Sequence, residues 1–195
     1  NAAKKVRDAY LYKNAAKKGK WHGPLAFLSR GRIMHDIAIY TVAVEYTDYL
    51  RRFDKRVPME HTGALQRPYI GVLLSVNGIS YFAPMSSPKL KHRKLSGLDV
   101  YRIDDGRLGI VNLNNMLPVP EACIRLVDIA HEADGKYKAL LEKQLRLLRA
   151  DKEKLLKKAR KLYNLRIKGH LPESMNDRCC DFALLEQKLP EYQQG

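Results

Sequence analysis

The sequence predicts an α+β fold in which an antiparallel sheet comes first and amphipathic helices follow. Two observations support this class. Runs rich in β-branched and aromatic residues, separated by turn sequences, fill the region from Ile37 to Ile129. Beyond Gly135, apolar residues recur every three or four positions, which is typical of helices that bury one face. We therefore expect an antiparallel sheet flanked by amphipathic helices.

The first expected strand is IAIYTVAVEY, residues 37–46, and Thr47 is expected to cap a short helix after it. A polar loop, residues 55–67, leads to the clearest pattern in the chain. There YIGVLLSV and ISYFAP, residues 69–76 and 79–84, flank Asn77-Gly78, which tolerates the positive φ angles of a type I′ turn. This pattern predicts a tight hairpin.

Shorter elements are expected after this hairpin. Residues 99–103 and 108–113 enclose the turn sequence Asp104-Asp105-Gly106 and predict a second hairpin, and residues 123–129 predict one more strand. The helical periodicity predicts one or two helices ending near Gly169, with their leucines packed on the sheet. Residues 181–188 are expected to close the chain as a turn or a short helix.

The charge is large and unevenly distributed. The 195 residues include 36 Lys+Arg and 21 Asp+Glu, a net charge of +15, and the excess is concentrated in residues 1–32 and 136–168. Residues 1–33 are also interrupted by glycines, so we expect a basic extension, native or added, outside a domain of residues 34–195. The charge favours nucleic acid as the partner over a membrane surface, because the helical runs lack a Trp/Phe-rich face.

Several classes of site and segment are absent from the sequence. It contains no phosphate-binding loop, no H-E-x-x-H, no G-x-S-x-G and no acidic cluster suited to magnesium. Its three cysteines have no zinc-ligand spacing and cannot form a disulfide framework. No apolar stretch is long enough to span a bilayer, and no secretory signal is visible. We therefore expect a cytoplasmic protein with no metal, no cofactor and no membrane contact.

The segment Ser86-Ser87-Pro88-Lys89-Leu90-Lys91-His92 leaves the end of a predicted strand. A loop in this position can present hydroxyls and a cation to one phosphate. RNA carries its own nucleophile, the 2′-hydroxyl, so cleavage needs a group to align that hydroxyl, cations for the phosphorane and a proton donor for the 5′-oxygen. A Ser-Pro turn followed by a solvated basic loop is the commoner meaning of such a segment. The residues alone leave both interpretations open.

Five blocks of the chain are similar to those of a known family. They are IAIYTVAVEYTDYLRRFDKRVP, YIGVLLSVNGISYFAPMSSPK, LGIVNLNNMLPVP, YKALLEKQLRLLRA and CDFALLEQKLPEY. In these blocks, which occur in matching order, the chain resembles the ToxN/AbiQ-like endoribonuclease toxins of type III toxin–antitoxin systems. The Ala-Pro-x-Ser-Ser-Pro-Lys sequence within the second block is the hallmark segment.

This resemblance implies a twisted antiparallel sheet with an SH3-like, partly open barrel core. It also implies a metal-independent endoribonuclease that acts on mRNA or other RNA and leaves 2′,3′-cyclic phosphate and 5′-hydroxyl ends. The implied partner is a small repeat RNA antitoxin, folded as a pseudoknot, that lies in a basic groove and forms a ring or smaller heteromer with the toxin. Growth arrest and abortive infection of phage are the implied cellular roles.

The family's site residues can be carried over by position. Ser87 corresponds to the essential serine, Ser86 to the preceding Thr/Ser, and Lys89 to the lysine beyond the proline. Arg67 falls where the family often has a lysine. Because arginine keeps its proton, we expect Arg67 to clamp a phosphate and not to act as a base.

Other expected RNA contacts rest on charge and aromatic character. Some family members have a tyrosine four residues before the position of Arg67, where this chain has Gly63, and His61 is a speculative substitute. Tyr40 and Tyr46, expected on the first strand, can approach the groove or pack in the core. The remaining expected RNA-binding residues are basic and lie in the loop and the first long helix: Lys91, His92, Arg93, Lys94, Lys143, Arg146 and Arg149.

An alternative function is a non-catalytic RNA- or DNA-binding module with an SH3-like core, whose basic surface binds phosphates without cutting them. A third class is a structural or assembly protein that binds another protein through its helices.

Overall fold

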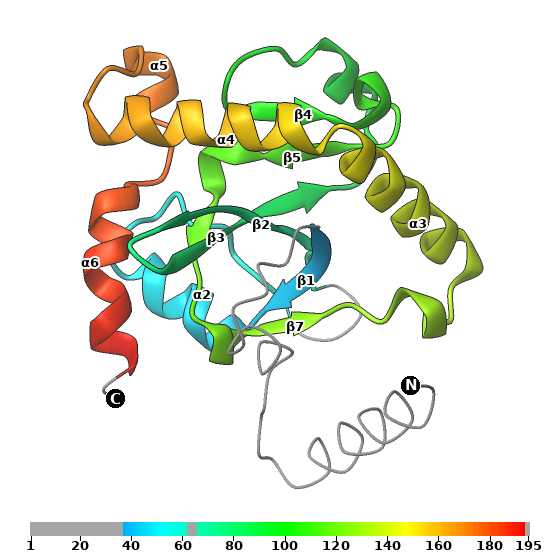
Figure 1. The fold of residues 1–195 in the computed structure, drawn as a ribbon, viewed down its shortest axis with the longest axis horizontal. Coiled ribbons are helices and arrows are strands. Elements are labelled where there is room, and N and C mark those ends of the chain that lie inside the picture. The colour runs from blue at the N-terminus through cyan, green and yellow to red at the C-terminus, as the bar shows by residue number, and fades with distance from the viewer. Residues whose placement is uncertain (1–36, 62–65, 194–195) are drawn as a thin grey trace, which may run out of the picture. The chain divides into compact units, whose positions relative to one another are not determined.

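The computed structural model describes residues 37–61 and 66–193, and the elements are labelled in Figure 1. The predictions for residues 1–33 and Gly63 lie outside these ranges. Seven strands of the described residues form an antiparallel sheet in the order β4-β5-β3-β2-β1-β7, with β6 pairing β3 beside this path. The strands are β1 (Ala38–Val42), β2 (Tyr69–Val76), β3 (Ile79–Ser86), β4 (Val100–Arg102), β5 (Ile110–Asn112), β6 (Leu117–Pro118) and β7 (Ile124–Leu126).

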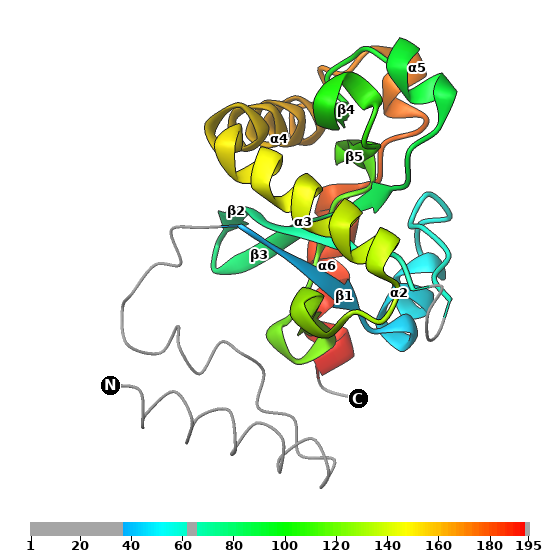
Figure 2. The same ribbon diagram turned by 90° about the vertical axis from the view of Figure 1, so that its right-hand side faces the viewer.

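The helices confirm the predicted α+β class. They are α2 (Val44–Arg51), α3 (Gly135–Ala150), α4 (Lys152–Ile167), α5 (Glu173–Asn176) and α6 (Phe182–Gln193). Figure 1 places α3 and α6 at opposite ends of the sheet, and Figure 2, viewed from the α3 end, shows α6 behind it. Among these described helices, none has both the length and the apolar character needed to cross a bilayer.

The sheet is open, because β4 and β7 stand at opposite ends of the strand order and do not pair. A closed barrel is therefore not formed by the described strands, and the SH3-like arrangement stays a prediction.

Both predicted hairpins are confirmed, and positive φ angles explain their turns. Strands β2 and β3 pair through Asn77 (φ 50°) and Gly78 (φ 80°), in the left-handed region that a type I′ turn requires. Strands β4 and β5 pair through Asp104 (φ 52°) and Asp105 (φ 51°). Asparagine and aspartate tolerate this region better than other non-glycine residues.

The prediction for residues 37–46 was wrong in its second half. Strand β1 ends at Val42 and α2 begins at Val44, so Tyr46 lies on a helix and not on the first strand. Thr47 does not cap this helix; its hydroxyl donates to the Val44 carbonyl (2.8 Å) from inside the first turn. Burial of Tyr46, Thr47 and Leu50 on one side of the helix outweighs the β-propensity of the run.

The closing element is longer than expected and is helical. Helix α6 extends from Phe182 to Gln193, and the Asp181 carboxylate accepts a hydrogen bond from the Leu184 amide (3.2 Å) at its start. The predicted helical region, expected to hold one or two helices, forms two, α3 and α4. The short strand β6 was missed, because two residues carry no periodicity.

Tyrosines are among the largest fully buried side chains of the core, and several of their hydroxyls have hydrogen-bond partners. Tyr46 is fully buried and donates to the Pro118 carbonyl. The hydroxyls of Tyr81 and Tyr163 both donate to Glu186 Oε1, at 2.6 and 2.7 Å. Because a buried hydroxyl without a partner is costly, these bonds allow aromatic area to be buried between the sheet, α4 and α6.

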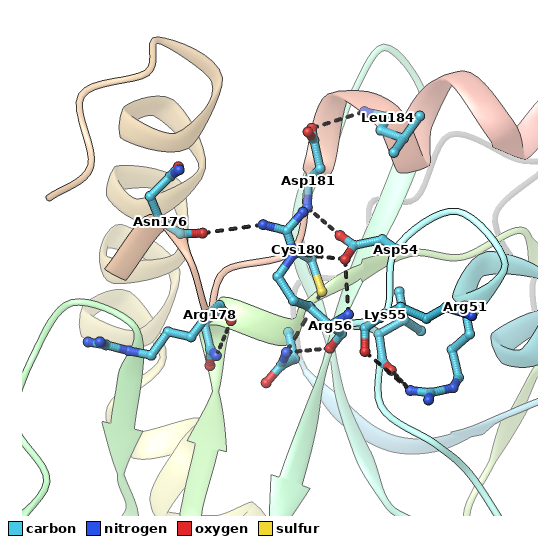
Figure 3. Close-up of polar contacts among 12 residues, drawn as sticks. Arg51, Asp54, Lys55, Arg56, Asn176, Arg178, Cys180, Asp181 and Leu184 are labelled. Carbon is cyan, nitrogen blue, oxygen red and sulfur yellow. Dashed lines mark hydrogen bonds and ion pairs between the residues drawn. The ribbon is translucent and has the colours of Figure 1, made fainter. Parts of the chain in front are cut away.

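A buried carboxylate fastens the start of α6 to the loop after α2. Asp54 is 3% exposed and accepts from Arg56 Nε (2.7 Å) and from the Asp181 amide (2.7 Å), as Figure 3 shows. Burial favours a raised pKa for Asp54, but these hydrogen bonds hold the pKa below its ordinary value. Asp54 is therefore ionised in the folded protein near neutral pH.

Gly71 in β2 is required by the core. A Cβ at this position would lie 2.2 Å from a ring carbon of Phe82. We expect Gly71→Ala to lower the free energy of unfolding by about 1–3 kcal/mol, because the ring must move in a packed core. Urea denaturation measures this change.

Gly135 provides the matched control, because a Cβ at the start of α3 would meet nothing within 4 Å. Gly135→Ala should leave stability unchanged or raise it by up to about 1 kcal/mol. Equal unfolding curves for Gly71→Ala and the wild type would contradict the tight packing of Gly71.

Candidate active site at the end of strand β3

The predicted catalytic segment begins where β3 leaves the sheet. The strand ends at Ser86, and Ser87 and Lys89 after it are exposed. Pro88 has no N–H to continue a ladder and restricts the preceding Ser87 to extended conformations. The serine hydroxyls and the lysine are therefore presented at the edge of a rigid element.

Pairing on both sides of β3 brings a further predicted residue to this end. The Pro68 carbonyl accepts a hydrogen bond from the amide of Met85 (2.8 Å), the residue before Ser86. Continuing the β2–β3 register two residues past the pair Tyr69–Pro84 places Arg67 opposite Ser86. On the other side, Ser86 pairs with Ile110 of β5. Arg67 and the two serines therefore lie at the same end of the hairpin.

A buried glutamate holds Arg67. The Arg67 Nε lies 3.7 Å from Glu60 Oε1, with the side chain of Glu60 1% exposed and that of Arg67 35% exposed. The Tyr69 hydroxyl donates to the same oxygen (2.6 Å). Burial raises the pKa of Glu60, against the opposing effects of the Tyr69 bond and the Arg67 charge. Glu60 thus holds the Arg67 side chain through its Nε, while the exposed part of the side chain is available to an anion. Sequence reasoning missed Glu60, which no motif marks.

The basic loop after Lys89 forms a 3₁₀ turn, η3 (Leu90–Lys94), with its cations outward. Lys91, Arg93 and Lys94 are exposed. Two contacts with the β4–β5 hairpin hold the loop backbone. Arg102 donates to the Arg93 carbonyl (2.8 Å), and Gly106 packs so closely that a Cβ there would lie 2.6 Å from the His92 carbonyl oxygen. The predicted cationic loop therefore has a defined conformation beside the serines.

His92 lies inside this loop and not on its surface. It is 3% exposed, and its Nδ1 has no hydrogen-bond partner in the described structure. Burial lowers the pKa of His92, and the charges of Lys89 and Lys91 lower it further. The imidazole is therefore neutral near pH 7. It offers almost no surface for the RNA contact predicted for it.

The predicted cations of α3 lie on its exposed side. Lys143, Arg146 and Arg149 are exposed, and Arg149 also donates to the Ile37 carbonyl (3.0 Å). Gln144 on the same helix is buried and donates to the Leu108 carbonyl (2.7 Å). Helix α3 is thus fixed to the β4–β5 hairpin, whose turn packs against η3.

The two predicted tyrosines are packing residues in this structure. Tyr40 is 3% exposed and packs edge-on against Phe82, with ring centroids 5.2 Å apart. Tyr46 is fully buried on α2. Neither has a surface for RNA to contact. His61, the suggested substitute for a family tyrosine, is exposed.

Sequence reasoning also missed the polar residue nearest to Ser86. The Asn112 side-chain amide, at the end of β5, donates to Ser86 Oγ (2.9 Å) and to the Pro84 carbonyl (3.3 Å). Pairing the two predicted hairpins with each other would have revealed it, but sequence alone does not show which strands pair. Within the described ranges, no group of three or more His, Cys, Asp or Glu side chains is placed to hold a metal ion.

Comparisons with known proteins match most of the chain. Residues 38–190 match the family described as toxin ToxN of type III toxin–antitoxin systems. The endoribonuclease ToxN of Bacillus thuringiensis subsp. kurstaki is 35% identical over 162 residues, which cover 80% of this chain and 84% of that protein.

Solved structures agree with this match. One is of a type III toxin–antitoxin system with selective toxin inhibition by a non-coding RNA pseudoknot; it has a TM-score of 0.71 at 32% identity, covering 82% of this chain and 99% of that one. The structure of AbiQ, a lactococcal anti-phage endoribonuclease, has a TM-score of 0.72 at 26% identity, with coverage of 82% and 99%.

The buried, neutral His92 predicts a pH dependence of stability. Because its pKa is lower in the folded state than in the unfolded state, the unfolded chain binds more protons as the pH falls below about 7. The wild type should therefore lose stability between about pH 7.5 and pH 5.5, and His92→Gln should lose less. Urea denaturation at the two pH values measures both losses, and equal losses would contradict a neutral His92.

Proposed function

The chain belongs to the ToxN family of type III toxin–antitoxin toxins, and on this premise we propose that it is an endoribonuclease that cleaves RNA through the substrate's own 2′-hydroxyl. The observation that carries the proposal is that Ser86, Ser87 and Lys89 lie at the end of β3, the end toward which the β2–β3 register also extends Arg67. Two hydroxyls and two cations beside one another suit a phosphodiester whose nucleophile comes from the RNA.

The reaction is a transesterification. The 2′-oxygen forms a bond to phosphorus, the bond from phosphorus to the 5′-oxygen breaks, and the products carry a 2′,3′-cyclic phosphate and a 5′-hydroxyl. The proton of the 2′-hydroxyl must leave and the 5′-oxygen must gain one. The phosphorane between these states carries extra negative charge, which fixed donors and cations stabilise.

Each residue has a role in this scheme. Ser87, exposed and held extended by Pro88, orients the 2′-hydroxyl or relays its proton. Lys89 places an ammonium group at the phosphorane. Arg67, anchored on Glu60, clamps a phosphate oxygen with its planar guanidinium group. These groups supply the alignment and charge that the reaction needs, so the proposed mechanism uses no metal.

The proposed partners are RNA molecules. Substrates are mRNA or other RNA, and the inhibitor is a small repeat RNA folded as a pseudoknot. The exposed cations beside the site supply the phosphate contacts: Lys91, Arg93, Lys94, Lys143, Arg146 and Arg149. We further propose that the toxin and the RNA assemble into a ring and that the protein acts in the cytoplasm. Its activity would arrest growth during phage infection.

Cleavage in the presence of EDTA tests the activity. We expect the purified protein to cut bulk cellular RNA under these conditions, because the nucleophile and the charged groups come from the RNA and the chain. The new 5′ ends should accept phosphate from a polynucleotide kinase without prior dephosphorylation, and the new 3′ ends should be cyclic phosphates. Intact RNA at protein concentrations that bind it would favour the non-catalytic binding module.

Replacing Ser87 separates cleavage from binding. Ser87→Ala should lower the cleavage rate by at least about 100-fold, the effect of losing one group that acts on the reacting atoms. Its affinity for RNA should change by less than about twofold, because phosphate contacts dominate binding. Single-turnover cleavage and filter binding measure these quantities.

Ser80 on the same strand is the matched control, because its position near the Asn77-Gly78 turn is remote from the end of β3. Ser80→Ala should cleave at the wild-type rate. Unchanged cleavage by Ser87→Ala would remove Ser87 from the mechanism.

A further inference from the structure

The hydroxyl of Ser86 has a fixed partner on the neighbouring strand. The side-chain nitrogen of Asn112 lies 2.9 Å from Ser86 Oγ and 3.3 Å from the Pro84 carbonyl oxygen. A carbonyl oxygen can only accept a hydrogen bond, so the NH₂ group of Asn112, and not its oxygen, faces both atoms. Asn112 is therefore the donor in its bond to Ser86.

This direction determines what the Ser86 hydroxyl can do. A serine hydroxyl has one hydrogen to donate and lone pairs that accept. The Asn112 bond occupies a lone pair, and within residues 37–61 and 66–193 the hydrogen has no acceptor of its own. Ser86 is half-buried and is the last residue of β3, so it is not enclosed in the core. The Ser86 hydroxyl can therefore donate its hydrogen to a bound ligand.

The backbone of Ser86 is held by the same strand connection. Gly109 has φ 101°, and a Cβ there would lie 2.2 Å from the Ser86 carbonyl oxygen, so the chain passes close behind this peptide. The preceding Leu108 carbonyl accepts from Gln144, which is 3% exposed on α3. Residues of one segment therefore fix both groups of Ser86: Gly109 packs against its peptide, and Asn112 of β5 binds its hydroxyl.

We infer that Asn112 is a positioning residue for the cleavage reaction, which directs the Ser86 hydroxyl to donate to a non-bridging oxygen of the scissile phosphate. The inference rests on the proposed function and assigns Ser86 to stabilisation of the phosphorane, not to removal of the 2′-proton. A donor fixed before the reaction stabilises developing charge without reorganisation. The proposed effect of Asn112 on kcat passes through the Ser86 hydroxyl, so it must disappear when that hydroxyl is absent.

A double-mutant cycle tests this dependence. The single variants Asn112→Ala and Ser86→Ala and the double variant are compared in kcat and KM on a short RNA spanning a site that the wild type cuts. We expect Asn112→Ala to lower kcat by about 10- to 100-fold, the range for loss of a group that orients a reacting partner, with little change in KM. The double variant should be no slower than Ser86→Ala alone.

Asn112→Asp keeps the size of the side chain and reverses the hydrogen bond, because a carboxylate accepts the Ser86 hydrogen. Its kcat should fall at least as far as that of Ser86→Ala, which decides the question even if Asn112→Ala folds poorly. Asn114→Ala is the control, since the Asn114 amide donates to the Arg178 carbonyl (2.8 Å), and its kcat should stay within about twofold of the wild type.

Two results would overturn the inference alone, and a third would overturn it together with the proposed function. Losses that multiply in the double variant, or a wild-type rate for Asn112→Asp, would show that Asn112 does not act through Ser86 while leaving the proposed function intact. A wild type that cuts no RNA would overturn the proposed function, and the inference with it.

Discussion

The position of the proposed active site depends on the pairing of β3 with a neighbour on each side up to its last residue. Met85 is bonded to the Pro68 carbonyl on one side, and Ser86 pairs with Ile110 on the other. Pro88 then prevents the ladder from continuing. The point at which the chain leaves the sheet is consequently fixed by hydrogen bonds on two strands. An end held in this way can present hydroxyls and cations with little loss of entropy when RNA binds.

Three buried or half-buried polar side chains hold the residues at this end of β3 in place. Glu60 anchors Arg67, Gln144 holds the Leu108 carbonyl, and Asn112 bonds Ser86 Oγ. Each has a partner, so the burial of polar atoms is compensated. His92 is buried in the basic loop, where its Nδ1 has no hydrogen-bond partner in the described structure, and its neutral form keeps one more positive charge out of a loop already rich in lysine and arginine. The exposed surface carries charge, whereas the polar side chains beneath it determine geometry.

The C-terminal part of the chain stabilises the other end of the molecule. Asp54 accepts the Asp181 amide at the start of α6, and Glu186 of that helix accepts from Tyr81 and Tyr163. The ring of Tyr192 packs against that of Tyr46, with centroids 4.9 Å apart. The closing block of sequence that resembles the family is therefore explained by packing against the sheet and α2, and none of its contacts reaches Ser86.

Elements that depend on residues close together in the chain could be predicted from the sequence. The Asn77-Gly78 turn, the Asp104-Asp105 turn and the period of α3 and α4 depend on residues a few positions apart, so each could be predicted from the chain. The family's blocks likewise identified Ser86, Ser87, Lys89 and Arg67 as candidates.

Which strands are neighbours and which side chains are covered depends on how the whole chain packs. The run from Ile37 to Tyr46 has β-branched and aromatic residues typical of one strand, yet it is a strand only as far as Val42 and becomes helical at Val44, where Tyr46 is buried against Pro118 and Tyr192. Tyr40 and His92 have the residue types of RNA ligands but lie inside. Asn112 and Ser86 are 26 positions apart and meet because β3 pairs with β5. Contacts of this kind depend on the packing of the whole chain, which no short stretch of sequence specifies.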